Sequence, residues 1–150
     1  MITRKILTAG AVLSILSMGA TSVVASAAPT SRTFAINAMG ANEMGRGDSM
    51  SSAFARGTIT VNTLKHNVCY EIMTHDLKNI TMSHLHLGKK GAEGNVVVTL
   101  NVMDFNLKAM GHACVTVPAM TAKQIFANPT GYYFNVHTKQ YPNGAVRAQL

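Results

Sequence analysis

Six short apolar runs, each five to eight residues long, constrain this fold more than any other feature of the sequence. They cover residues 57–64, 68–72, 95–100, 113–117, 132–138 and 145–150. In the first run Ile59 and Val61 alternate with polar residues, which is the period of a strand with one buried face. Turn-forming clusters at 88–94 and 141–144 separate later runs. Short strands at this spacing predict an all-β sandwich or barrel.

One short helix is expected among these strands. Thr121 and Gln124 have the spacing of a capping box, and Ile125 with Phe126 supplies an apolar face. Pro129 ends the helix early, because proline cannot continue the helical hydrogen-bond pattern. The helix is therefore two turns at most and links two strands.

The first 27 residues have the pattern of a secretory signal peptide. Arg4 and Lys5 precede an uncharged apolar stretch at 6–24, and Ala25-Ser26-Ala27 offers the small residues that a signal peptidase accepts. The alternative is a permanent membrane anchor, since the stretch approaches the ~20 residues of a span, but seven Gly, Ser and Thr residues dilute it. We expect cleavage after Ala27, a mature domain at 28–150 with no membrane span, and a periplasmic or secreted location.

Export makes the two cysteines a candidate disulfide. Cys69 and Cys114 are an even pair, which tends to oxidise outside the cytoplasm. The bond would close a loop of 45 residues, worth about 4 kcal/mol on the chain-entropy model. Two buried free thiols are the alternative. A metal site built on cysteines alone is not expected, because neither has a second Cys or a His at the usual close spacing.

Three of the six histidines form the strongest chemical signal. His84 and His86 are two apart, so in a strand they project from the same face as Met82. His137 shares a strand face with Asn135. Three converging imidazoles suit copper or zinc, and water or Met82 could supply a fourth ligand.

The alternative is a purely structural role for these histidines. Each could hydrogen-bond loop backbone and hold the turn at 88–94. Arg147, if it lies nearby, would repel a cation and favour such a network. His66, His75 and His112 fall near loops and are expected to be solvated.

Composition and motifs exclude several functional classes. Only 13% of the residues are charged, and loss of Arg4 and Lys5 lowers the formal charge from +7 to +5. Lys89-Lys90 is the one basic doublet of the mature chain and has no aromatic platform beside it, so no nucleic-acid partner is expected. The sequence has no nucleophile elbow, phosphate-binding loop or dinucleotide fingerprint, and its six acids are scattered. We expect no enzyme activity.

Several polar motifs in a fixed order resemble those of the chordin-type (CHRD) domain family. They are Gly40-Ala-Asn-Glu43, Cys69-Tyr70, Ser83-His-Leu-His-Leu-Gly88, Gly91-Ala-Glu-Gly-Asn-Val-Val-Val98, Asn128-Pro129, Tyr132-Tyr-Phe-Asn-Val-His-Thr138 and Tyr141-Pro-Asn-Gly-Ala-Val-Arg-Ala-Gln-Leu150. The resemblance covers about residues 33–150. It implies an immunoglobulin-like or Cu,Zn superoxide dismutase-like Greek-key β-sandwich with one short helix, in a secreted protein.

The resemblance also sets the functional expectation. Chordin itself binds growth factors, and single-domain bacterial members mostly have no assigned activity. The expected function is therefore an exported, non-catalytic binding or structural module, whose partner is an unidentified extracytoplasmic protein or surface. A weaker similarity links His84, His86, His137 and Arg147 to the copper ligands and guiding arginine of the Cu,Zn superoxide dismutases. The long zinc-binding loop of those enzymes is missing here, so dismutase activity is not expected.

Overall fold

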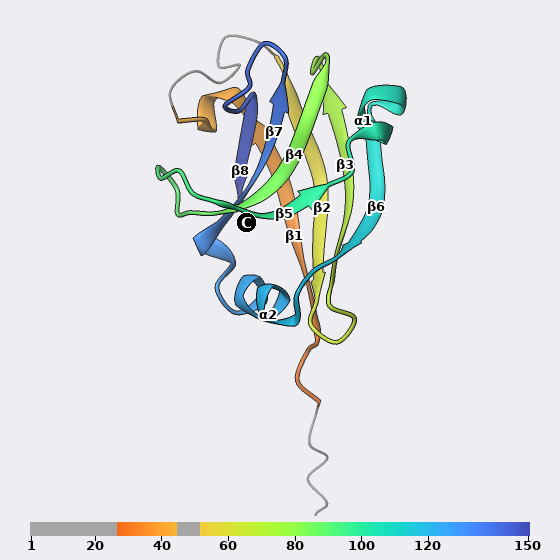
Figure 1. Cartoon of the computed structure of the whole chain (residues 1–150), viewed down its shortest axis with the longest axis vertical. Helices are drawn as coiled ribbons and strands as arrows, with labels where there is room; N and C mark the ends of the chain where they lie inside the picture. Colours follow the sequence, from red (N-terminus) through yellow and green to blue (C-terminus); the bar gives the residue numbers. More distant parts are fainter. Residues whose placement is uncertain (1–26, 45–51) are drawn as a thin grey trace, which may run out of the picture.

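A computed structural model describes residues 27–44 and 52–150 as an all-β sandwich (Figure 1). The predicted signal segment lies outside the described residues except for Ala27. Eight antiparallel strands run in the order β5-β4-β7-β8-β1-β2-β3-β6. In chain order they are β1 (Ser31–Met39), β2 (Phe54–Asn62), β3 (Asn67–His75), β4 (Ile80–Leu87), β5 (Val96–Leu100), β6 (Met110–Thr116), β7 (Tyr132–Thr138) and β8 (Val146–Gln149). The predicted fold class is confirmed.

The sandwich has two halves that meet along a narrow seam. Strands β1, β2, β3 and β6 pair over seven to nine residues each, whereas β1 and β8 are paired only at Met39 and Arg147. Alternate residues of both halves point inward and form one apolar core. Its largest fully buried side chains include Phe134, Ile59, Ile72 and Leu85.

Strand β1 was not among the predicted strands. Phe34, Ile36 and Ala38 alternate with exposed residues along it and are buried in the core. The period-2 signal is therefore present in the sequence, but it is short and weak because it spans only three apolar positions, with Ala35 and Asn37 between them. Pairing with β2 along its whole length compensates for this weakness.

The predicted helix exists as α2 (Ala119–Ala127), but its N-cap is Pro118, three residues before the predicted cap at Thr121. Pro118 precedes its first turn, and no side chain caps it, so Thr121 lies inside the helix rather than at a capping box. The carbonyl of Pro118 accepts a hydrogen bond from the Ala122 N–H at 3.1 Å, which closes the first turn. Ala122 and Ile125 are buried, and α2 closes one end of the core (Figure 1).

A second helix, α1 (Met103–Lys108), was not predicted. It precedes β6 and contributes Phe105, whose ring fills the space that a Cβ at Gly111 would need. The described residues also include two single 3-10 turns, η1 (Gly40–Asn42) and η2 (Pro129–Gly131). No helix in the part of the chain that the structure describes is long and apolar enough to cross a membrane.

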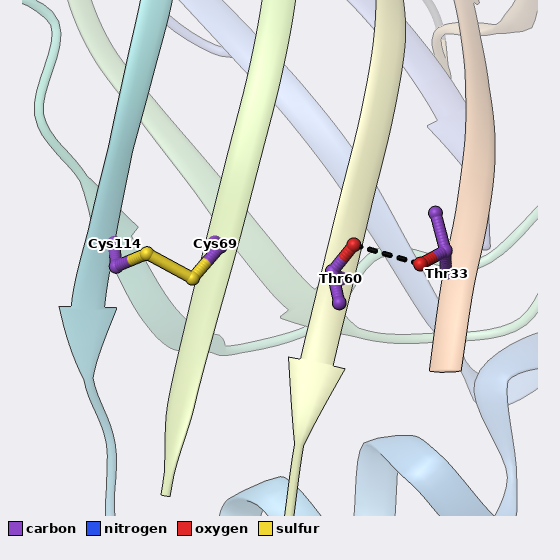
Figure 2. The surroundings of a disulfide bond; sticks show 4 residues. All are labelled: Thr33, Thr60, Cys69 and Cys114. Carbon is purple, nitrogen blue, oxygen red and sulfur yellow. Dashed lines mark hydrogen bonds between the residues drawn. A yellow bond between two sulfur atoms is a disulfide. The ribbon is translucent and has the colours of Figure 1, made fainter. Parts of the chain in front are cut away.

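The disulfide between Cys69 and Cys114 is present and lies on the outer surface of the β1-β2-β3-β6 half (Figure 2). The two residues are direct partners across β3 and β6. Thr60 and Thr33 continue the same row across β2 and β1, where their hydroxyls are 2.8 Å apart. The predicted pairing is confirmed, and the bond adds a covalent link to strands that already pair.

Truncation of Phe134 to alanine should destabilise the domain by about 3–5 kcal/mol, because the side chain is fully buried in the apolar core. Urea unfolding followed by circular dichroism measures the change. Leu64→Ala is the matched control, since Leu64 is 72% exposed and its loss should change stability by less than about 0.5 kcal/mol. Equal losses in the two variants would contradict the assignment of the core.

Candidate functional site

The pairing of β4 with β7 brings the three predicted histidines together. His84 lies opposite Asn135, and His137 lies opposite Met82. His84, His86 and His137 therefore project from the same face of the two strands, while Leu85 and Phe134 point into the core. Their ring centroids are 5.0–5.8 Å apart. The predicted convergence is found in the structure.

Loops cover this face of the sheet, so the histidines are buried on a surface that would otherwise meet water. Each is at most 8% exposed. The loop at 88–94 is held over the site by Arg147, whose guanidinium donates hydrogen bonds to the carbonyls of Lys89 and Ala92 at 3.1 and 2.7 Å. Gly94 of that loop also contacts His86. Pro142, in the turn at 141–144 that follows β7, contacts His137. The result is a polar pocket between a sheet and two loops.

Backbone carbonyls fix the tautomers of two of the rings. His86 Nδ1 lies 2.9 Å from the Gly94 carbonyl, and His137 Nδ1 lies 3.0 Å from the Pro142 carbonyl. A carbonyl can only accept, so both Nδ1 atoms carry the proton and both Nε2 atoms present a lone pair. In metal sites a hydrogen bond of this kind commonly orients the coordinating imidazole.

The lone pairs point into one small region. His84 Nδ1 lies 3.2 Å from His137 Nε2, and one nitrogen from each of the three rings lies within 4.8 Å of the others. Two nitrogens bound to one tetrahedral zinc are about 3.3 Å apart, since each bond is about 2.0–2.1 Å. His86 Nε2 is buried and has no hydrogen-bond partner in the described part of the chain. A shift of about 1.5 Å would thus bring all three nitrogens to coordinating distance.

All three imidazoles are held in the neutral form. Burial, together with the smaller effects of the neighbouring His137 and His86, lowers the pKa of His84 to about 4. Burial also lowers the pKa of His86 and of His137, against the opposing effect of their bonds to Gly94 and Pro142. A neutral imidazole is the form that binds a metal ion. Near pH 7 the cluster therefore need not lose a proton to solvent before coordination.

Arg147 lies close to the cluster but is separated from it by an aromatic ring. Tyr133 on β7 stands between β4, which carries His86, and β8, which carries Arg147. The Tyr133 ring stacks on His86 with centroids 4.8 Å apart, and the guanidinium lies 3.4 Å over the same ring. The positive charge of Arg147 contributes to the low pKa of His86. Its bonds to loop carbonyls and to the ring face give it partners other than the histidines.

Glu43 is a member of the site that the motif analysis did not single out. Its Oε1 accepts a hydrogen bond of 2.6 Å from Asn135 Nδ2, and burial raises its pKa to about 7 although Arg147 pulls it down. With His86, Tyr133, Asn135 and Arg147 it borders a hollow of about 290 Å³ beside the cluster. The sequence signal was available in the motif Gly40-Ala-Asn-Glu43, but nothing in its spacing relates it to a strand near the end of the chain.

The remaining predicted residues lie at the edge of the site or outside it. Met82 is the direct partner of His137 and is 45% exposed, so its role as a fourth ligand stays a prediction. Asn135 is buried beside the histidines. His66, His75 and His112 are exposed and lie outside the cluster.

Comparison with known families identifies the domain. The family model for the CHRD domain matches residues 34–150. The chain belongs to the CHRD domain family. The match begins in β1 and includes all the residues of the site, among them Glu43, His84, His86, His137 and Arg147. Searches of curated proteins and of solved structures found no match.

The metal-free protein should lose stability as the pH falls from about 6.5 to about 4. An unfolded imidazole binds a proton near pH 6.5, but folded His84 binds one only near pH 4, so acid favours the unfolded chain in this window. Glu43 opposes this trend, because its raised pKa makes the folded state the more protonated one between about 4.5 and 7. Three histidines with lowered pKa values outweigh one carboxyl.

Thermal unfolding at pH 7 and pH 4.5, in the presence of a chelator, tests this. Between pH 7 and pH 4.5 the unfolding temperature of the wild-type protein should fall by several degrees more than that of His84→Gln. His112→Gln is the control, since this exposed residue should leave the pH dependence unchanged. The same pH dependence in wild type and His84→Gln would show that the buried histidines do not set it.

Proposed function

We propose that this CHRD domain is an exported, non-catalytic binding module. Three features support the proposal: a family match over nearly the whole predicted mature chain, a disulfide of the kind that forms in oxidising compartments, and a buried polar site bordered by loops. The location is the periplasm or the exterior of the cell. The partner is a protein or surface outside the cytoplasm.

We propose copper or zinc as the ligand of the histidine cluster. The observation that carries this is the lone pair of His86 Nε2, which is buried without a partner in the described part of the chain. A buried acceptor that lacks a donor costs roughly 1–3 kcal/mol, and a bound cation removes that penalty. His84 Nδ1 and His137 Nε2 complete a set of imidazole ligands, which suits copper and zinc better than calcium or magnesium.

Coordination requires one change within the cluster. In the metal-free state His84 Nδ1 donates its proton to His137 Nε2, since the latter carries a lone pair. To bind an ion, His84 would need to carry its proton on Nε2, so that His84 Nδ1 and His137 Nε2 could both serve as ligands. The carbonyls of Gly94 and Pro142 continue to orient the other two rings. The low exposure of the site favours a held ion over one that turns over a substrate.

Export and oxidation can be tested on material recovered from the periplasm or medium. We expect the intact mass to match a chain that starts at Ala28. It should be 2 Da below the mass of the reduced chain, since the disulfide removes two hydrogens. Reduction and alkylation should label Cys69 and Cys114 only after a reductant is added. An uncleaved start, or two free thiols in native protein, would contradict the proposal.

Metal binding can be tested on protein treated with a chelator and then titrated with Zn²⁺ or Cu²⁺ in competition with a chromophoric ligand. We expect one equivalent to bind with a dissociation constant in the micromolar range or below. His86→Ala and His137→Ala should each weaken binding at least tenfold, because each removes one of three ligands.

His66→Asn is the matched control for these variants. His66 is exposed and has a φ of 50° in its turn, a conformation that asparagine accepts. It should bind metal as wild type does. Absence of uptake by the folded wild-type protein would make the cluster structural, and turnover of a substrate that is lost in His84→Ala would overturn the non-catalytic assignment.

A further inference from the structure

The disulfide lies in a ladder of side chains that could bind a metal ion once the bond is reduced. On the outer face of β3 and β6, Cys69 lies opposite Cys114 and Glu71 lies opposite His112. Cys69 and Glu71 are two residues apart on one strand, as are His112 and Cys114 on the other, so all four side chains share that face. Directly opposed Cβ atoms are about 4.5–5.5 Å apart. Two thiols, an imidazole and a carboxylate thus lie within one small area of the sheet.

The bond is accessible from solvent and the strands do not depend on it for their register. Cys114 is exposed and Cys69 is half-buried. β3 and β6 pair without interruption from Asn67 and Thr116 to Met73 and Met110. Val68 and Tyr70, on either side of Cys69, are buried in the core. Reduction removes a constraint on the unfolded chain of about 4 kcal/mol but leaves this ladder and the core contacts in place.

The surface beside the bond is hollowed, and its polar side chains are available. A hollow of about 150 Å³ is bordered by Thr58, Thr60, Cys69, Glu71 and His112. In the part of the chain that the structure describes, the His112 imidazole and the Glu71 carboxylate make no hydrogen bond or ion pair. The nearest arginine in the next row, Arg56, is held by Asn37 and stacks over Phe54. No partner group therefore has to be displaced from His112 or Glu71.

We propose that the reduced protein binds one Zn²⁺ or Cu⁺ ion through Cys69, Cys114 and His112, with Glu71 or water as a fourth ligand. Two sulfurs and one imidazole nitrogen are a ligand set that these ions favour. The site differs from the histidine cluster, since it lies on the other half of the sheet and exists only after reduction.

The chemistry balances with an external dithiol as the reductant. A thiolate of the dithiol attacks one sulfur of the Cys69–Cys114 bond and forms a mixed disulfide, and the second thiol of the dithiol resolves it. The dithiol gives up two electrons and two protons and becomes a disulfide, while Cys69 and Cys114 become thiols. Metal binding then releases the two thiol protons. An external disulfide can reverse the step: it accepts the two electrons and takes up two protons to become a dithiol, the Cys69–Cys114 bond re-forms and the ion is released. Metal binding at this site therefore depends on the redox state of the cysteine pair.

The proposal can be tested by absorption spectroscopy. Co²⁺ is added to the mature protein in two samples, one previously reduced and one left oxidised. Reduced protein should show thiolate-to-cobalt charge-transfer absorption, which imidazole ligands alone cannot produce, and should bind one more equivalent of Zn²⁺ than oxidised protein. His112→Ala should weaken this extra binding at least tenfold, and Glu71→Gln should weaken it less. The His86→Ala variant should retain it in full.

His75→Ala is the matched control, because His75 lies on the same face of β3 but six residues beyond Cys69. It should bind the extra ion as wild type does. Circular dichroism of the reduced protein reports whether the ladder survives. Unfolding on reduction, absence of the charge-transfer band in folded reduced protein, or a band that His112→Ala leaves unchanged would each overturn the proposal.

Discussion

The antiparallel register of β4 with β7 is the constraint on which the rest of this structure depends. It places Leu85 and Phe134 in the core and, one residue along, His84 and Asn135 on the opposite face. Because side chains alternate with a period of two, a slip of one residue would send the imidazoles into the apolar core and the core residues outward. The burial of Leu85 and Phe134 therefore stabilises the position of the histidines as well as the fold.

A sheet face that carries three imidazoles can be buried at low cost only if other groups form hydrogen bonds with the ring nitrogens. The carbonyls of Gly94 and Pro142 accept from two of the rings, and Glu43 accepts from Asn135. His86 Nε2 and Asn135 Oδ1 are buried without a partner in the described region, and both residues border the hollow beside the cluster. Buried polar atoms without partners are unfavourable in a purely structural role, and this favours a site built for a ligand.

Local sequence patterns predicted the strands, the disulfide and the convergence of His84, His86 and His137, because each depends on alternation, spacing or a shared family pattern. The capping box at Thr121 was wrong because the N-cap of α2 is Pro118, three residues earlier. Strand β1 was missed because its alternating apolar pattern is short, and its pairing with β2 along its whole length supplies the stability that this pattern lacks. The contact of Glu43 with Asn135 and the position of His112 opposite Glu71 also went unpredicted. Both arise from contacts between segments far apart in the sequence, and local residue spacing carries no information about such contacts.

Arg147 joins parts of the molecule that are otherwise separate. Arg147 is the residue of β8 that pairs with Met39 of β1 at the seam. Its backbone carbonyl accepts a hydrogen bond from the side chain of Asn42 in η1. Its guanidinium holds the loop at 88–94 over the site. Closure of the sandwich and coverage of the site therefore share one residue, and we expect both to open in a single cooperative event. Amide hydrogens of the loop should consequently exchange at rates set by the seam rather than by the fluctuations of a free surface loop.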